Sequence, residues 1–496
     1  MDVLGPSVND DPAGAKKTAL QTNVPAASRY RFFWRLHFWS GLITAPIVLF
    51  AAVTGLIYVF SPQIEAVLYE RLDTVVPSGV AMPLDAQIAA ARRAVPDLPI
   101  RSVIVGSQPE QSTQVLFGER KRRGADAAKP ATAVAASGGE HAHHTGSTPP
   151  SGEASTGRSA AIVNPIVYVN PYTAEVLGVQ AEMDRFRNWS EKLHSTALQG
   201  DNWRWIIELG ASWLLVMLAT GLYLWWPKPQ AAGGQGVRAL VPRMNESGAR
   251  ASRIAWRDWH AVIGIAASAM LLIILVTGLT WSKYTGENFR AALNAAGQSS
   301  PKPPEKLQSI RSSSDQIALN AAQVLEIGRR VAPDIRLALT PPRGGTGVWR
   351  IANSDRRQPT ARVQLIVEQY SGAILYRSGW DELPIGAKAT GVGIPFHRGE
   401  FGWWNQALLI FTALAVIASV VSGFVMWWKR RPAGKIAAPA IGWGHVRAVP
   451  WWMVVLALGL GYVMPVFGVS LAALLAVEIC RLCWVSRKFH LESPSA

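Results

Sequence analysis

Long apolar stretches alternate with long polar segments along this chain. Four apolar stretches, at about 38–60, 205–226, 261–282 and 404–428, are each long enough for a helix that crosses the hydrocarbon core of a membrane, which takes about 20 residues. A fifth block, at 450–484, is too long for one untilted span. The pattern predicts an α-helical integral membrane protein whose two long segments, about 61–204 and 283–403, lie outside the membrane.

The first and third stretches carry the same landmarks at the same spacing. In both, a histidine is followed after four residues by a glycine and after 17 residues by a threonine. These residues are His37, Gly41 and Thr54 in the first, and His260, Gly264 and Thr277 in the second. The second and fourth stretches are each preceded by a histidine and each end in a tryptophan pair. These residues are His194 with Trp225 and Trp226, and His397 with Trp427 and Trp428. The chain is therefore a duplication.

The two exterior segments repeat an order of elements as well. Helical periodicity at Leu84–Val95 and at Asp315–Arg330 is followed each time by short runs with strand character and a turn. The first set of runs is Ile100–Val105, Thr113–Phe117, Ile166–Asn170 and Glu175–Gly178, and the second is Ile335–Thr340, Gly347–Asn353, Arg362–Glu368 and Ala373–Tyr376. The pattern predicts two small α+β exterior domains, one in each repeat.

The predicted segments follow one another along the whole chain. They are a disordered cytoplasmic tail (1–28), a first transmembrane helix (29–62), a first exterior domain (63–185) with a low-complexity insertion (119–160), a second transmembrane helix (186–228), a cytoplasmic loop (229–255), a third transmembrane helix (256–284), a second exterior domain (285–390), a fourth transmembrane helix (391–431), a cytoplasmic loop (432–449), a C-terminal apolar hairpin (450–484) and a cytoplasmic tail (485–496). The insertion contains His141, His143 and His144 and is predicted to be a flexible loop, with weak metal binding as the alternative.

The charge of the chain is strongly basic, with a net value of +16. Its Lys and Arg residues gather before the first span, between the second and third spans and after the fourth span. Clusters in short segments beside spans are the positive-inside pattern, so we expect the N-terminus and the short loops to be cytoplasmic. This placement accounts for the charge without a nucleic-acid partner. Only two cysteines occur, so disulfides do not build the exterior domains.

The C-terminal block is predicted to fold back on itself. A single crossing would place Arg481, Arg487 and Lys488 outside, against the charge pattern, whereas a hairpin folded at about Gly461–Pro465 returns them to the cytoplasm. A single crossing remains the alternative. Glu478 lies within this block and needs a charged partner or a place at the interface.

The orientation sorts the four matched histidines into two pairs. His37 and His260 lie at the cytoplasmic ends of their spans, and His194 and His397 lie at the exterior ends. A neutral imidazole is a good axial ligand for haem iron, and facing helices of a four-helix bundle can hold one haem between two such ligands. We expect a four-helix haem-binding bundle with two haem b groups per chain, bound without covalent attachment because no C-x-x-C-H occurs. The alternative is that the histidines are structural.

Other residues beside the histidines fit the same interpretation. Arg35 and Arg257 precede their histidines by two and three residues and could reach haem propionates. Gly41 and Gly264 lie one turn beyond the histidines and leave room for a flat macrocycle. Four more glycines near the opposite span ends would admit the haem of the other pair or allow close helix packing. These are Gly55, Gly221, Gly278 and Gly423.

Three segments resemble a known family. The sequence VYVNPYTAEVLG at Val167–Gly178 is similar to the end of a PepSY domain, and HFWSG at His37–Gly41 and WRDWH at Trp256–His260 resemble PepSY-associated transmembrane helices. The resemblance extends over about 30–430 and takes in the C-terminal block. Members of that family are iron-regulated proteins of the bacterial inner membrane, and the ferrisiderophore reductases among them bind haem b.

The resemblance implies reduction of a periplasmic ferric chelate, for which we expect a ferric siderophore. It implies a multi-pass inner-membrane protein in contact with lipid, with electrons entering near His37 and His260 and leaving near His194 and His397. The chain lacks a G-x-G-x-x-G unit that opens a soluble βαβ domain, so a quinol or a cytoplasmic partner is the expected electron donor. A PepSY protein that binds peptides or regulates proteases is one alternative. A siderophore or metal transporter is another, although outside the C-terminal block the spans show neither a chain of ion pairs nor the paired broken helices typical of transporters.

Overall fold

The computed structural model describes residues 24–119, 163–226, 249–313, 315–432, 434, 438–447 and 449–492. Most of the predicted tail, most of the insertion with its three histidines and most of the first cytoplasmic loop lie outside the described residues. The first helix, α2 (Val24–Val59), begins at the end of the stretch that was predicted to be disordered. Ala26 and Ala27 extend it because alanine has the highest intrinsic helix propensity.

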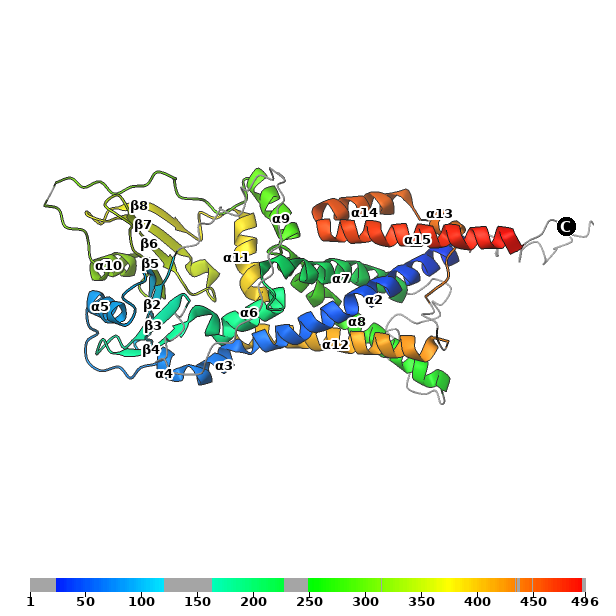
Figure 1. Ribbon diagram of the computed structural model, residues 1–496, viewed down its shortest axis with the longest axis horizontal. Helices are drawn as coiled ribbons and strands as arrows, with labels where there is room; N and C mark the ends of the chain where they lie inside the picture. The colour runs from blue at the N-terminus through cyan, green and yellow to red at the C-terminus, as the bar shows by residue number, and fades with distance from the viewer. Residues whose placement is uncertain are drawn as a thin grey trace, which may run out of the picture.

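Four long helices form the membrane part of the molecule. They are α2, α7 (Arg204–Trp225), α8 (Ala249–Leu279) and α12 (Trp403–Arg430). The packing contacts run in a closed ring from α2 to α7, α8, α12 and back to α2 (Figure 1). The centre of this four-helix bundle is an apolar cluster of Val48, Ala52, Leu214, Leu275 and Val416. These helices are apolar all round, as lipid-facing helices are.

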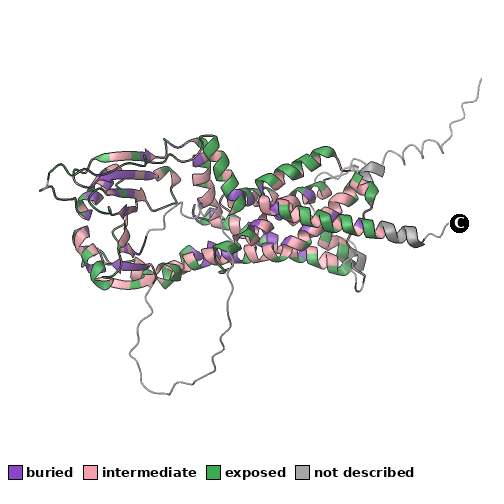
Figure 2. Ribbon diagram, turned by 45° about the horizontal axis from the view of Figure 1, so that its top comes forward, coloured by how far each residue is buried: buried purple, intermediate pink, exposed green. Residues whose placement is uncertain are grey.

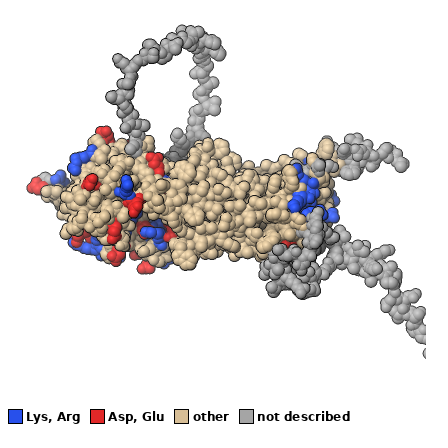
Figure 3. Space-filling model, turned by 90° about the horizontal axis from the view of Figure 1, so that it is seen from below, with Lys and Arg blue, Asp and Glu red and all other residues tan. Residues whose placement is uncertain are grey.

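The outer surface of the bundle is uncharged over most of its length. Charged residues gather at the two ends of the face seen in Figure 3, with an uncharged belt between them. Large apolar side chains are exposed on the bundle, among them Phe411, Leu414 and Phe424 on α12. The ribbon in Figure 2 is accordingly mostly intermediate or exposed along these helices. Five described helices are long and apolar enough to cross a membrane, so the chain is a multi-pass membrane protein.

The second and fourth predicted spans each consist of two helices. α6 (Phe186–Thr196) precedes α7, and α11 (Ile385–His397) precedes α12. The first break contains Ala197 and Leu198 at φ of 50° and 61° and Gly200 at φ of 90°, and the second contains Gly399 and Gly402 at φ of 72° and 91°. Left-handed residues end a helix. The single helices expected over 186–228 and 391–431 are thus corrected to a short helix, a break and a long helix.

The exterior strands form one sheet instead of two. The strands are β1 (Ile100–Val105), β2 (Thr113–Phe117), β3 (Pro165–Val169), β4 (Val176–Ala181), β5 (Leu337–Thr340), β6 (Val348–Asn353), β7 (Val363–Glu368) and β8 (Ile374–Gly379). Their order in the sheet is β4-β3-β2-β1-β5-β6-β7-β8, and all neighbours are antiparallel. The expected strands are present. The two repeats nevertheless join, because β1 pairs with β5 through Val103, Ile104 and Val105.

Two helices cover the side of the sheet that faces away from the bundle (Figure 1). They are α5 (Leu84–Ala94) and α10 (Ala321–Val331), and between them and the strands lies the exterior core. α10 begins six residues later than predicted because Asn320 and Gln323 form a capping box. Asp85 of α5 also accepts hydrogen bonds from the first amides of α10, so the first repeat supports the helix of the second.

The C-terminal block folds back as a helical hairpin, as the sequence predicts. α14 (Trp451–Val463) packs along α15 (Pro465–Glu492), and a Cβ on Gly461 would lie 3.1 Å from the Cα of Gly468. α14 is shorter than a helix that spans a membrane, whereas α15 is long enough. Trp213 of α7 fixes the hairpin to the bundle by donating to Ser470 at 2.8 Å. The remaining helices are α3 (Ser61–Leu68), α4 (Glu70–Asp73), α9 (Tyr284–Ala295) and α13 (Trp443–Arg447).

Candidate functional site

One histidine pair lies at the end of the bundle that carries a cluster of Lys and Arg residues (Figure 3). His37 of α2 and His260 of α8 have ring centroids 6.4 Å apart and ring planes at 83°. Arg430 marks the same end, with its guanidinium 4.6 Å from the centroid of the Trp34 ring. We call His37 and His260 the basic-side pair. The structure brings them together across the duplication, as the predicted orientation requires.

The other pair lies at the end nearest the sheet. His194 is near the C-terminus of α6 and His397 is the last residue of α11. Both line one cavity between the four bundle helices, together with Gly55 and Gly278. The rest of the lining is mainly aliphatic, including Val48, Leu214, Leu275 and Val416. We call His194 and His397 the sheet-side pair; the slot between them is apolar, as a macrocycle requires.

All four imidazoles have the same local surroundings. Each Nδ1 lies within hydrogen-bond distance of a hydroxyl oxygen on the neighbouring helix of its own repeat. The pairs are His37 with Thr220 at 3.0 Å, His194 with Thr54 at 3.0 Å, His260 with Ser422 at 3.0 Å and His397 with Thr277 at 3.2 Å. Because Nδ1 is occupied in this way, Nε2 is the ring nitrogen that remains for a ligand-binding role.

A glycine follows each of these hydroxyl residues and lies against the same ring. A Cβ added to the glycine would lie from 2.9 to 3.7 Å from the imidazole Cε1. The glycines are Gly221 for His37, Gly55 for His194, Gly423 for His260 and Gly278 for His397. We call each Thr-Gly or Ser-Gly pair a seat. The glycines of the seats therefore make room for the histidine rings, a role that helix spacing alone does not reveal.

The basic-side pair fits a shared haem iron. Two imidazoles that bind one iron must lie close together, because each ring nitrogen would be about 2 Å from the metal. The observed separation of the two ring centroids is 6.4 Å. Within the residues that the structure describes, no group of three or more His, Cys, Asp or Glu gathers to hold a metal ion. Two facing imidazoles are a ligand set that suits haem iron.

The two arginines predicted to reach propionates have other partners. Arg35 is buried and donates to the carboxylate of Glu478 and to the carbonyl of Pro439. Glu478 also accepts from Arg481, so the acidic residue within the C-terminal block is paired. Arg257 donates to the adjacent Asp258. In these positions Arg35 links α2 to the hairpin, and a propionate role for either arginine stays a prediction.

The sheet-side cavity has polar groups that the sequence did not single out. Arg204, Arg398, Glu191 and Tyr58 all belong to its lining. Arg398 donates to the hydroxyl of Tyr58 at 2.7 Å and to Glu191 at 3.1 Å. The position of Arg398 immediately after His397 was the available clue.

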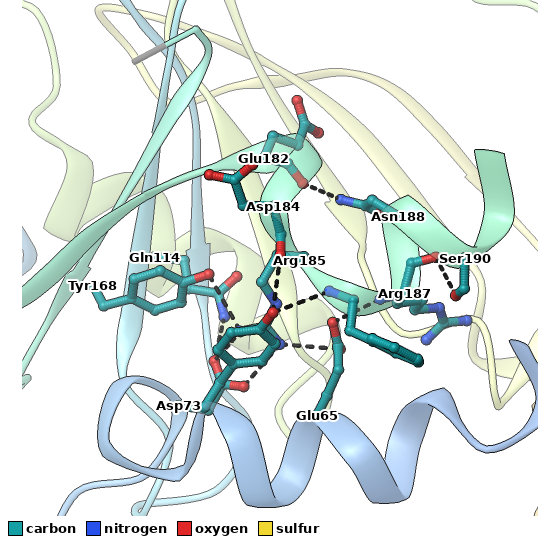
Figure 4. Close-up of polar contacts among 12 residues, drawn as sticks. Glu65, Asp73, Gln114, Tyr168, Glu182, Asp184, Arg185, Arg187, Asn188 and Ser190 are labelled. Atoms are coloured by element: carbon teal, nitrogen blue, oxygen red, sulfur yellow. Dashed lines mark hydrogen bonds and ion pairs between the residues drawn. The ribbon is translucent and has the colours of Figure 1, made fainter. Parts of the chain in front are cut away.

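A partly buried ion-pair network ties α6, which carries His194, to α3 and α4. Arg185, directly before α6, donates to Asp73 at 2.8 Å and to Glu65 at 3.1 Å and lies over the Tyr69 ring (Figure 4). Burial works to lower the pKa of Arg185, but the hydrogen bond to Asp73 and the neighbouring carboxylates raise it above its usual value. Burial raises the pKa of Tyr168 to about 12, so this phenol stays neutral. The start of α6 is therefore fixed by charge.

These features define a duplicated, multi-pass membrane protein with two paired histidine sites. The family model for the PepSY-associated TM region matches residues 34–430, and the chain belongs to that family. No curated protein matches the chain.

Proposed function

We propose that this protein is a di-haem b electron-transfer protein that reduces a ferric chelate, such as a ferric siderophore, on the outer side of the membrane. One observation carries the proposal: two histidine pairs lie at opposite ends of one apolar bundle. In each ring Nδ1 is within hydrogen-bond distance of a seat hydroxyl, which leaves Nε2 as the nitrogen for a ligand-binding role. Haem supplies one-electron chemistry, and the protein sets its position and access.

Each end of the bundle would hold one haem. His37 and His260 would hold one haem at the basic end, and His194 and His397 would hold the other beside the exterior sheet. Val48, Leu275 and Val416 give the sheet-side cavity an aliphatic wall at the centre of the bundle. Arg204 and Arg398 line the exterior cavity together with Glu191 and Glu208. The seats hold all four rings in place from the neighbouring helices.

The proposed location is the bacterial inner membrane, with the N-terminus in the cytoplasm. The basic clusters support this orientation, because cytoplasmic loops carry the excess of Lys and Arg. The electron donor would then be a quinol in the membrane or a cytoplasmic partner. Release of iron follows from reduction, since the hard-oxygen ligands of siderophores hold Fe(II) less tightly than Fe(III).

The test begins with haem content. Protein purified from cells supplied with haem should give two haems per chain in a pyridine haemochrome assay. The reduced protein, freed of reductant, should be reoxidised by a ferric hydroxamate siderophore in the absence of oxygen. The same siderophore loaded with redox-inert Ga(III) is the control and should leave the spectrum unchanged. Well under one haem per chain would contradict the proposal and favour a PepSY protein whose histidines are structural.

A further inference from the structure

We infer that the four seat hydroxyls are positioning residues that fix the tautomer of the histidine ligands and tune each haem separately. The inference rests on the proposed function, because it concerns residues that act on the haem through its ligands. The seat hydroxyls are those of Thr54, Thr220, Thr277 and Ser422.

The hydrogen bonds of the seat hydroxyls decide the tautomer. Each hydroxyl donates to a carbonyl of its own helix three or four residues earlier. The bonds run from Thr54 to Phe50 at 2.7 Å, from Thr220 to Val216 at 2.9 Å, from Thr277 to Ile273 at 2.7 Å and from Ser422 to Ser419 at 3.1 Å. A hydroxyl has one proton to donate, so its oxygen can only accept from the imidazole. The imidazole Nδ1 must therefore carry a proton.

Backbone carbonyls give the same answer independently. Nδ1 of His260 lies 3.1 Å from the carbonyl oxygen of Ser419, and Nδ1 of His397 lies 3.0 Å from that of Ile274. A carbonyl oxygen has no proton, so Nδ1 is again the donor. A neutral ring protonated at Nδ1 presents the lone pair of Nε2. The two kinds of acceptor thus prepare Nε2 as the ligand atom before any haem binds.

Two acceptors on one N–H also make the ring a stronger electron donor. A hydrogen bond from the far nitrogen of a ligating histidine raises its basicity, and loss of such a partner typically weakens metal binding by about 10–100-fold. Second-shell hydrogen bonds to axial ligands also set haem potentials. Removing one seat hydroxyl should therefore shift the potential of its own haem to a more positive value.

A seat and the histidine that it supports lie on different helices, and this makes the inference testable. Thr54 lies on the same helix as His37 but supports His194, at the opposite end of the bundle. Thr220 lies on α7, the helix that comes after His194 in the chain, but it supports His37. A change that only disturbed α2 would act on the histidine that α2 carries. A change that acts through the seat would act on the histidine at the other end.

The experiment compares Thr54→Val with Thr220→Val by redox titration and low-temperature EPR of the purified holoprotein. Thr54→Val should shift the potential and the low-spin signal of the sheet-side haem alone, and Thr220→Val those of the basic-side haem alone. Thr54→Ser and Thr220→Ser should restore the wild-type values. Thr44→Val is the matched control, because Thr44 is a buried threonine of α2 whose hydroxyl lies within hydrogen-bond distance of the Ser40 carbonyl and the Met217 sulfur rather than of a histidine ring nitrogen.

The outcomes separate this inference from the proposed function. Two haems in the wild type, with unchanged potentials and EPR signals in both valine variants, would overturn the inference and leave the proposed function standing. Equal shifts in the valine variants and in Thr44→Val would also overturn it, since the effect would then be general to the helix. A wild-type protein without haem would instead overturn the proposed function. Loss of one haem in a valine variant, restored by serine, would support the inference.

Discussion

The two histidine pairs have equivalent hydrogen-bond partners but lie on different kinds of helix. His37 and His260 lie within α2 and α8, helices of 36 and 31 residues that continue through the whole bundle. His194 and His397 lie at the ends of α6 and α11, helices of 11 and 13 residues that stop before the spans begin. The basic-side histidines are therefore positioned by membrane helices. The sheet-side histidines are positioned from outside as well.

The exterior support reaches the sheet-side pair through charged contacts. Arg185 fixes the start of α6 to Asp73 and Glu65, and Arg398, next to His397, contacts Glu191 of α6. α6 and α11 are thus joined to each other, and α6 is also joined to α3 and α4. The difference teaches that a duplicated protein can keep one ligand geometry while it couples only one of its two sites to the exterior domain.

The largest expected effect comes from removing one ligand of each pair. His397→Ala should lose the sheet-side haem and keep the basic-side haem, and His260→Ala should do the reverse, because a single imidazole remains at each altered site. Haemochrome assays and redox titrations should each show one haem per chain, and both variants should lose ferric chelate reduction. His445→Ala is the control, since His445 lies in α13 outside both pairs. Full activity with two haems in His397→Ala would contradict the proposed path.

A smaller, graded effect is expected from the seat glycines. A Cβ at position 278 would lie 2.9 Å from Cε1 of His397, closer than side chains approach one another, whereas a Cβ at position 423 would lie at an ordinary 3.7 Å from Cε1 of His260. Gly278→Ala should displace His397 and weaken binding of the sheet-side haem. Gly423→Ala should leave the basic-side haem in place.

The two glycine variants control for each other. Both replace a glycine within a helix and gain about 1 kcal/mol of helix propensity, so that contribution is shared. The measurement is haem content after detergent extraction and after a chase with apomyoglobin, which removes loosely held haem. Equal haem loss in both variants would show that distance from the ring does not decide the outcome.

The sequence was sufficient for the membrane helices and for the pairing of the histidines. The spans follow from apolar length, and the pairing of His37 with His260 follows from the side of the membrane on which each repeat begins. The strands were predicted from the alternation of apolar and polar residues within short runs. All of these depend on local pattern or on the duplication, which one sequence displays directly.

The remaining features depend on contacts between distant parts of the chain. β1 and β5 could each have been the edge strand of a separate small sheet, so nothing local in the sequence shows that they pair with each other. The pairing of Arg35 with Glu478 joins residues more than 440 positions apart, so proximity to His37 in the sequence pointed to a different partner. The break after α6 places Ala197 and Leu198, two non-glycine residues, at positive φ, which local propensity does not predict.

The smallest expected effect tests whether the exterior support acts on one site only. The side chains of Arg185 and Glu65 are each 14% exposed, so Arg185→Leu leaves partly buried carboxylates without their cation, at a cost of about 3 kcal/mol. The start of α6 should loosen, and the sheet-side haem should be released at a lower temperature than in the wild type. The basic-side haem should keep its release temperature, because α2 and α8 do not depend on Arg185.

Haem release during heating can be followed separately for the two sites from their Soret bands after selective reduction. Arg101→Leu is the matched control: it removes an ion pair with Glu182 whose partners are 21% and 35% exposed, more than Arg185 and Glu65, and pairs nearer to the solvent contribute less. Arg185→Leu should therefore lower the sheet-side release temperature and Arg101→Leu should not. If Arg185→Leu lowered both release temperatures equally, the exterior layer would support the whole bundle, and the two pairs would not differ in the way that their helices suggest.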